Sequence, residues 1–112
     1  MILNIKSPST FITEVSTISK LSNSIVSTKL KVVFKDGFFY LTRRNKNSKW
    51  YNNLLSNRYA EILINNENIV TSAEEMIDEA EKKEVSSIKY ADKRREDNRY
   101  GFKLTIENGP RK

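Results

Sequence analysis

The chain of 112 residues contains no cysteine and no histidine. The lack of cysteine excludes a disulfide framework, a thiolate nucleophile and any zinc or iron–sulfur site built on thiolates. The lack of histidine removes the side chain most often used for proton transfer near neutral pH, which is also the commonest metal ligand. We therefore expect no metal ion, and we expect any catalysis to need a bound cofactor.

Long apolar runs are missing as well. No stretch approaches the roughly 20 apolar residues that cross a bilayer, and the opening residues, Met1 to Lys6, are too short and too weakly basic for a signal peptide. We therefore expect a cytoplasmic protein that does not enter a membrane. Glycine and proline are scarce, at 3 and 2 residues. Because no stretch is typical of a linker, we expect residues 1–112 to form a single domain.

Positive charge is unevenly distributed along the chain. The formal net charge is +6, and residues 1–58 hold ten Lys or Arg against only Glu14 and Asp36. The remainder is slightly acidic. Clustered positive charge attracts phosphates, acidic lipids or nucleic acid. The distribution therefore predicts an anionic partner, and the alternative is a basic surface that only keeps the protein soluble.

The first predicted element is a short amphipathic helix within residues 7–24, followed by a lead-in to the next element. Apolar residues recur there every three or four positions, as on one face of a helix. These residues are Phe11, Ile12, Val15, Ile18 and Leu21. We expect the helix to begin near Ser9 or Thr10.

Residues 25–43 are typical of a β-hairpin. Apolar and polar residues alternate before Asp36-Gly37, and an Asp-Gly loop favours a hairpin because Gly readily accepts a positive φ. Pairing Lys35 with Phe38 then fixes the register of the two strands.

The hairpin register predicts one core face and one outer face. The core face would carry Leu30, Val32, Phe34, Phe39 and Leu41. The outer face would be a mixed aromatic and cationic surface that could stack a planar ring or remain a half-covered sheet face, and it would be formed by Lys31, Val33, Phe38 and Tyr40.

A polar basic loop, residues 43–49, leads into a predicted short helix. Ser48 or Asn47 can cap its start, Trp50 would pack over Leu54, and Asn57 would end it in the left-handed conformation. The predicted helix therefore starts at the end of a loop with four cationic residues, Arg43, Arg44, Lys46 and Lys49.

The second half of the chain predicts another hairpin, a helix and a last strand. Residues 58–64 and a shorter strand around Ile69 and Val70 form the hairpin. Thr71 or Ser72 with Glu74 or Glu75 would be the capping box of a helix that buries Met76, Ile77 and Ala80, pauses near residues 85–87 and continues to about Asn98. Residues 102–106 alternate as a strand, and residues 108–112 would be a loose tail. This order predicts an α+β domain built on a small antiparallel barrel or sheet with flanking helices.

The middle of the chain resembles a known family. The run from Asp36 to Thr42, the polar loop, and the run Trp50-Tyr51-Asn52-Asn53-Leu54 with its Asn turn and following strand resemble the split-barrel flavin-binding proteins, particularly the deazaflavin-dependent nitroreductase branch. The resemblance covers about residues 25–80. It implies a split β-barrel, a homodimer, and a bound FMN or deazaflavin that carries out hydride transfer, with no catalytic side chain assigned.

The resemblance also implies where the cofactor would bind. The basic loop would meet the cofactor's phosphate or acidic tail, helped by backbone N–H groups at the helix start. Trp50 and Tyr51 would flank the ring or hold the helix against the barrel. The implied cofactor-binding residues are Arg43, Arg44, Lys46, Ser48, Lys49, Trp50 and Tyr51.

Two other interpretations remain open. The hairpin and the basic loop could bind single-stranded nucleic acid by stacking and phosphate contacts. The residues for this are Lys29, Lys31, Phe38, Tyr40, Arg43 and Arg44. The protein could also be an interaction protein that kept the fold and lost its ligand, because the Gly-rich phosphate loop of the family is replaced by Ser22-Asn23-Ser24. The acidic residues of 74–79 are interpreted as a solvated helix face rather than a metal site.

Overall fold

The computed structural model describes residues 5–43, 47–90 and 99–107. These residues form six β-strands and two α-helices. The strands are β1 (Ser9–Ile18), β2 (Ile25–Lys35), β3 (Phe38–Arg43), β4 (Tyr59–Ile64), β5 (Glu67–Glu75) and β6 (Tyr100–Ile106). The helices are α1 (Lys49–Ser56) and α2 (Glu79–Lys89).

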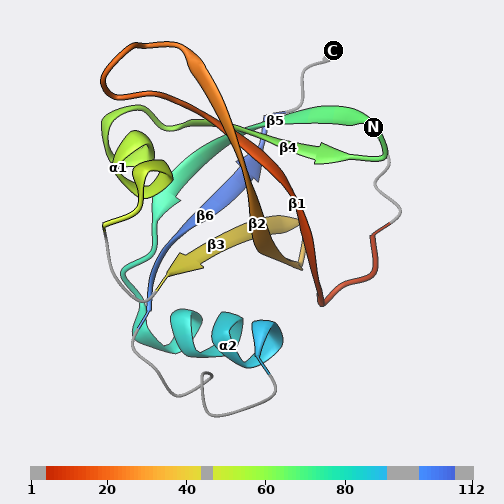
Figure 1. Ribbon diagram of the computed structural model, residues 1–112. Coiled ribbons are helices and arrows are strands. Elements are labelled where there is room, and N and C mark those ends of the chain that lie inside the picture. Colours follow the sequence, from red (N-terminus) through yellow and green to blue (C-terminus); the bar gives the residue numbers. More distant parts are fainter. Residues whose placement is uncertain (1–4, 44–46, 91–98, 108–112) are drawn as a thin grey trace.

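The strands close into an antiparallel barrel in the order β1-β2-β3-β6-β5-β4 (Figure 1). A short pairing between β1 and β4, centred on Ser16 and Glu61, completes the circle. A closed barrel leaves no unpaired strand edge. The predicted fold class, a small antiparallel barrel with flanking helices, is confirmed.

Alternate strand residues fill the barrel interior, as the two-residue period of a strand requires. The buried apolar residues contributed by the strands include Val15, Val32, Phe34, Phe39, Leu41, Ala60, Ile62, Ala73, Phe102 and Leu104. Helix α1 adds Trp50, Tyr51 and Leu54 to the same core. The Tyr51 ring lies 4.7 Å from the Phe102 ring between centroids. Its hydroxyl donates to the Glu75 carboxylate at 2.5 Å, so the one polar atom of this buried ring has a partner.

The register of the β2–β3 hairpin is the predicted one. Lys35 pairs with Phe38 and Phe34 with Phe39. Asp36 and Gly37 both have positive φ, at 53° and 89°, as a two-residue turn of this kind requires. The core face is therefore confirmed.

The outer face of this hairpin differs from the prediction. Val33 and Tyr40 are 0% and 2% exposed because Met76 and Val85 cover them. Helix α2 lies over this side of the barrel (Figure 1). Val33 and Tyr40 of the predicted surface thus belong to a second small core, and Phe38 packs against it, whereas Lys31 is only half-buried.

The predicted N-terminal helix is wrong, because residues 9–18 form strand β1. Every second side chain along β1 points inward, and Val15 and Thr17 are fully buried. Ile12, which the helical pattern placed on the apolar face, is 69% exposed. The β-branched residues of this segment favour a strand. Thr17 can face the barrel interior because its hydroxyl has a hydrogen-bond partner, Asn53.

The predicted start of the long helix is also wrong. Thr71 and Ser72 lie inside β5, which continues to Glu75. Helix α2 begins after Asp78, whose carboxylate accepts a hydrogen bond from the Ala80 N–H, and it runs through residues 85–87 without a pause. The acidic residues of 74–79 are therefore divided between a strand and a helix instead of sharing one helix face. The predicted continuation to Asn98 and the predicted tail lie outside the described residues.

The elements around α1 follow the prediction closely. Strand β4 occupies Tyr59–Ile64, and the turn after it places Asn65 and Asn66 at positive φ. Asn57 follows α1 but has a φ of −146°, so the predicted left-handed end is wrong. Its N–H donates to the Asn53 carbonyl at 2.8 Å, which ends the helix with an extended residue instead.

Candidate functional site

Asn53 adds two hydrogen bonds to the apolar packing that holds helix α1 on the barrel. The side-chain NH₂ of Asn53 donates to the Thr17 hydroxyl at 3.1 Å, and its oxygen accepts from the Lys20 N–H at 2.9 Å. Asn53 is 6% exposed, so the hydrogen bond to Thr17 is shielded from water, and the one from Lys20 is partly shielded. They hold α1 against β1 and the start of the β1–β2 hairpin.

The N-terminus of α1 presents unused donors. Ser48 is the N-cap residue, but its side chain makes no capping hydrogen bond, and the first turn contains no acidic residue. The Ser48 hydroxyl and the Trp50 indole Nε1 are both buried with no hydrogen-bond partner among the described residues. Buried polar groups are normally satisfied. This end of α1 therefore has the donors expected where an anionic or polar ligand binds.

An open groove of about 780 Å³ lies between α1 and the β1–β2 hairpin. We call it the α1 groove. It is lined by residues that include Lys29, Arg43, Ser48, Lys49 and Trp50. None of the described residues that line it is acidic. The described part of its lining therefore supplies positive charge and no carboxylate to neutralise it.

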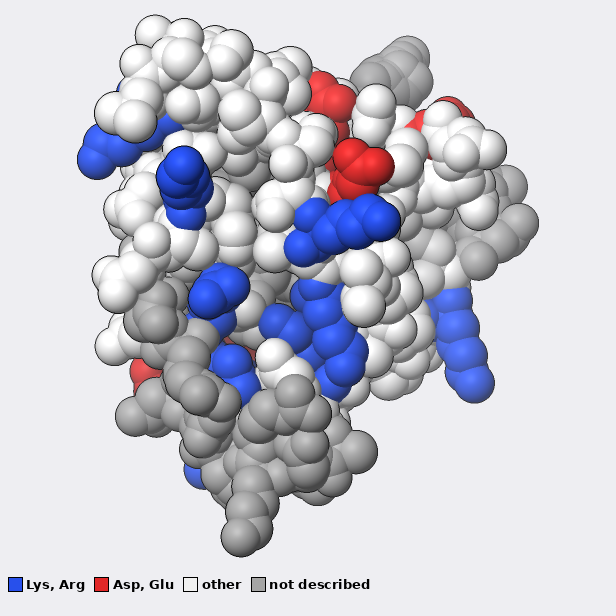
Figure 2. Space-filling view, in the orientation of Figure 1, with Lys and Arg blue, Asp and Glu red and all other residues white. Residues whose placement is uncertain are grey.

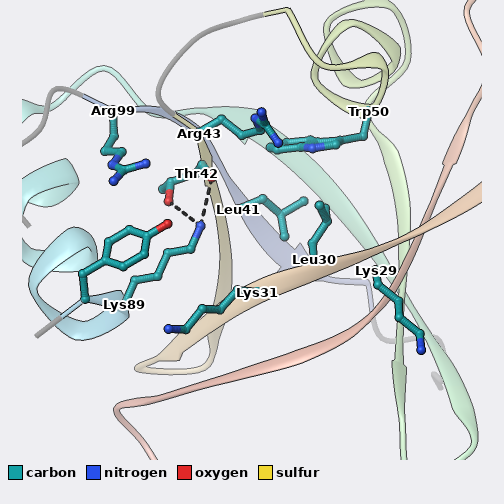
Figure 3. A pocket seen from close by; sticks show the side chains of 10 residues that line it. Lys29, Leu30, Lys31, Leu41, Thr42, Arg43, Trp50, Lys89 and Arg99 are labelled. Atoms are coloured by element: carbon teal, nitrogen blue, oxygen red, sulfur yellow. Dashed lines mark hydrogen bonds between the residues drawn. The ribbon is translucent and has the colours of Figure 1, made fainter. Parts of the chain in front are cut away.

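A second hollow of about 460 Å³ adjoins the groove and shares Lys29, Leu30, Arg43 and Trp50 with it. We call it the basic cavity. Its other charged lining residues are Lys31, Lys89 and Arg99, and its described lining again includes no carboxylate. Figure 2 shows Lys and Arg side chains gathered around a hollow on this face. Figure 3 shows that β2, β3, α1 and α2 all contribute side chains to it.

Lys89, like Arg99, is a well-enclosed cation of the basic cavity. Its side chain runs from the end of α2 toward β3 (Figure 3), and the residue is 7% exposed. Its Nζ donates to the Thr42 carbonyl at 3.0 Å and to the Thr42 hydroxyl at 3.2 Å. Burial, together with the positive charges of Arg99, Lys31 and Arg43, lowers the pKa of Lys89 from its ordinary 10.5 to about 8.

Three cations surround one aromatic ring in the same cavity. Lys31 Nζ lies 5.3 Å and Lys89 Nζ 5.4 Å from the centroid of the Tyr90 ring. The Arg99 guanidinium carbon lies 4.6 Å from it. The negative face of an aromatic ring offsets part of the repulsion between such cations. The ring therefore helps three like charges to lie close together.

The structure brings together most of the residues implied for the cofactor. Arg43 and Trp50 line both hollows, and Ser48 and Lys49 line the α1 groove. Tyr51 is fully buried against Phe102 and contacts neither hollow, so its place is that of a residue holding α1 to the barrel. Arg44 and Lys46 lie outside the described residues.

The residues named for nucleic acid are divided between the hollows and the buried face. Lys29 and Lys31 line the basic cavity. Tyr40 is buried under α2, and Phe38 packs against the same second core. A base could not stack on Tyr40 without displacing α2.

Sequence reasoning missed Lys89, Tyr90 and Arg99. No local sequence pattern singles out these three residues. The nearest signal was the density of Lys and Arg in the second half of the chain, which the nearby carboxylates concealed.

Neither a protein-family model nor a curated protein sequence matches the chain. Solved structures do match it. A proposed 5-nitroimidazole antibiotic resistance protein from Bacteroides thetaiotaomicron superposes with a TM-score of 0.68 at 13% identity, covering 87% of this chain and 73% of that one. General stress protein 26 from Bacillus anthracis gives a TM-score of 0.64 at 17% identity, covering 90% and 81%. An F420 reductase gives 0.58 at 8% identity, covering 91% and 89%.

The chain folds as a split barrel. The resemblance seen in the sequence is confirmed at the level of the fold, because identities this low establish the fold alone. The α1 groove and the basic cavity are thus features of a split barrel whose ligand has to be argued from its own residues.

Two further findings bear on the site. Within the described part of the chain, no helix is both long and apolar enough to cross a membrane. Among the same residues, no three acidic side chains are grouped so that they could hold a metal ion.

Proposed function

We propose that this split barrel binds a phosphorylated flavin or deazaflavin in the α1 groove and acts as an oxidoreductase. The observation that carries the proposal is the N-terminus of α1. Uncapped backbone N–H groups, a buried Ser48 hydroxyl and a buried Trp50 Nε1 lie there beside Arg43 and Lys49. Backbone donors at a helix start, reinforced by cations, favour a phosphate.

The dimensions of the site suit a cofactor. Pockets for small molecules measure roughly 300–1,000 Å³, and the α1 groove alone is about 780 Å³. Its wall includes the flat indole of Trp50 and the apolar Leu30 and Val26, against which a planar ring can pack. Lys29 and Arg43 lie along the same groove and add positive charge.

When bound, the cofactor would supply hydride transfer, which no side chain of this chain can carry out. The protein would hold the phosphate at the α1 N-terminus and fix the ring beside Trp50. The hydrogen bonds of Asn53 to Thr17 and Lys20 keep α1 in place for that task. No side chain is assigned a catalytic role.

Nucleic-acid binding is the weaker proposal. A single strand needs exposed aromatic platforms as well as cations, and the buried Tyr40 does not provide one. The basic residues that remain surround concave hollows of small-molecule size. Both features favour a small anionic ligand.

We also propose that the protein forms a homodimer. The end of the β1–β2 hairpin exposes Leu21 at 94%, Ile25 at 57% and Val26 at 43%. Leu21 and Val26 also line the open side of the α1 groove. A second copy that covered these apolar residues would also enclose the groove. Light scattering is expected to give a dimer for the wild-type protein and a larger monomer fraction for Leu21→Asp.

Titration with FMN and riboflavin tests the cofactor proposal, because the two differ only by the phosphate. We expect FMN to bind saturably, with quenched fluorescence, and at least about tenfold more tightly than riboflavin, as a charge-assisted phosphate site requires. The paired change Arg43→Ala and Lys49→Ala should remove most of that difference. The control is Arg58→Ala, an exposed cation outside both hollows. Equal affinity for the two ligands, or no binding of FMN and of a deazaflavin, would refute the proposal.

A further inference from the structure

We propose that the basic cavity is a second anion site, which binds the phosphate group of a small substrate beside a cofactor held in the α1 groove. The pairing of substrate with cofactor rests on the proposed function. Phosphate binding in the cavity stands on the cavity's own residues.

The charges of the cavity come from separate parts of the fold. Lys31 lies in β2, Lys89 is the last residue of α2, and Arg99 is the residue just before β6. All three lie within 5.4 Å of the centroid of one ring, that of Tyr90. The positive charges of Arg99 and Lys31 disfavour the charged form of Lys89, so the three cations repel each other. A bound dianion would turn this repulsion into attraction, and no described lining residue is a carboxylate that could do so.

Lys89 has a donor left for a ligand. An ammonium group carries three N–H donors, and Thr42 accepts from this one twice, at 3.0 and 3.2 Å. These two bonds fix the Nζ in the wall of the cavity (Figure 3). One N–H therefore remains for an acceptor inside the cavity. Phosphate suits a site of this kind because its oxygens accept several charge-assisted hydrogen bonds at once.

The volume of the basic cavity suits a small substrate better than a whole cofactor. At about 460 Å³, the basic cavity is near the lower end of small-molecule pockets. Leu30, Leu41 and Trp50 supply an apolar wall for the rest of a small molecule. Trp50 and Arg43 line both hollows, so a compound in the cavity would lie next to a ring packed in the groove. Such contact is what hydride transfer between two bound molecules requires.

Calorimetric titration with inorganic phosphate at constant ionic strength tests the site without any cofactor. We expect saturable binding, and we expect Lys89→Met to weaken it by about tenfold or more because a buried charge-assisted hydrogen bond is lost. The matched control is Lys83→Met on the exposed face of the same helix, which should leave the affinity within about twofold. A second variant, Lys31→Gln, removes a partly exposed cation of the cavity and should also weaken binding. Equal losses in Lys89→Met and Lys83→Met would overturn the proposal, since they would show only a general charge effect.

The pH dependence of anion affinity distinguishes a lysine that binds the anion from one that only supports the fold. A lysine with a purely structural role would not change this pH dependence. Sulfate is the probe, since a phosphate monoester itself titrates near pH 6. Among the residues that the structure describes, the charged groups around Lys89 are Lys31 from β2, Arg43 from β3 and Arg99 before β6, with Tyr90 beside them. Sulfate affinity should fall as the pH rises above about 8, where Lys89 loses its proton. In Lys89→Met, affinity should stay nearly constant over the same range, and a parallel fall in both proteins would contradict the assignment.

A final titration separates this proposal from the cofactor proposal. Phosphate should still bind, with its affinity reduced by less than about threefold, when the α1 groove is saturated with FMN. Competition between FMN and phosphate for Lys89 would overturn the second site, because the cavity would then hold the cofactor's own phosphate. Phosphate binding that depends on Lys89 in a protein that binds no flavin would leave the anion site standing and refute the cofactor instead.

Discussion

The two parts of helix α2 handle charge in opposite ways. Along its middle turns, carboxylates meet cations of the neighbouring strands. Lys35 Nζ lies 2.7 Å from the Glu84 carboxylate, and Lys103 Nζ lies 3.7 Å from that of Glu81. In the last turn, Lys89 enters a cavity whose other charged lining residues, among those the structure describes, are all positive.

The difference separates stability from binding. Paired charges at a surface contribute little but do not oppose folding. A buried cation among other cations destabilises the folded state, and the lowered pKa of Lys89 expresses that cost. Strained electrostatics of this kind are concentrated at functional sites. We infer that the middle turns of α2 hold the helix on the barrel and that its last turn serves a ligand.

The largest effect is expected at Gly101 in β6, the strand that binds the segment ahead of α2. Its carbonyl accepts the Met76 N–H at 2.8 Å ahead of α2. A Cβ there would lie 2.4 Å from the Leu41 carbonyl oxygen and 2.8 Å from Thr42 Cγ2 in the wall of the basic cavity. We expect Gly101→Ala to lower the free energy of unfolding by about 3 kcal/mol, because β3 and β6 must separate.

Denaturant unfolding measures that loss, and Gly37→Ala is the matched control. Gly37 has a φ of +89° but nothing within 4 Å of an added Cβ. Its substitution should cost about 1 kcal/mol from backbone strain alone. Equal costs at the two glycines would contradict the close approach of β6 to β3.

The next effect is a gain in stability. Lys89→Met removes a buried charge and keeps an unbranched chain, so we expect the free energy of unfolding at pH 7 to rise by about 1–2 kcal/mol. The pKa of Lys89 is lowered in the folded state, and the unfolded state therefore binds more protons between about pH 8 and 10.5. Wild-type stability should rise with pH through that window.

The measurement is the difference in unfolding free energy between Lys89→Met and wild type at pH 7, 8, 9 and 10. That difference should shrink as the pH rises. Burial and Glu81 raise the pKa of Tyr40 to about 12, but this contribution is common to both proteins and cancels. A difference that stays constant with pH would show that Lys89 is not a strained cation.

The smallest effect is expected at Lys35, the counterpart of Lys89 in the paired region. Lys35→Met removes the ion pair with Glu84, whose side chain is 60% exposed. We expect a loss of at most about 1 kcal/mol, decreasing in high salt. The same substitution should thus have opposite signs at the two positions. A gain in stability for Lys35→Met, measured in the same unfolding series, would show that the lysine paired with Glu84 and the buried Lys89 do not differ in their effect on stability.

Local signals predicted part of the fold well. The Asp36-Gly37 turn, the register of β2 with β3, the position of α1 and the strand β4 all depend on turn chemistry and on short-range periodicity. The N-terminal segment failed because Phe11 and Val15 fit a helical spacing and a strand alternation equally well. Only the pairing of β1 with both β2 and β4 decides between them.

The sequence predicted only the part of the site whose residues are close together along the chain. That part consists of Arg43, Ser48, Lys49 and Trp50, which lie within eight positions of one another and were therefore grouped from the sequence alone. Lys89 and Arg99 reach the same hollow only because α2 covers the outer face of the hairpin. That packing depends on the apolar outer residues Val33 and Tyr40, which sequence periodicity assigned to a surface.

A crystal structure of the protein grown with FMN and excess phosphate would locate both proposed ligands at once. We predict the FMN phosphate at the first turn of α1 near Ser48 and Lys49, the ring against Trp50, and a separate phosphate within hydrogen-bond distance of Lys89 Nζ. A cofactor phosphate bound at Lys89, or an α1 groove without cofactor at saturating FMN, would refute the presence of two separate anion sites.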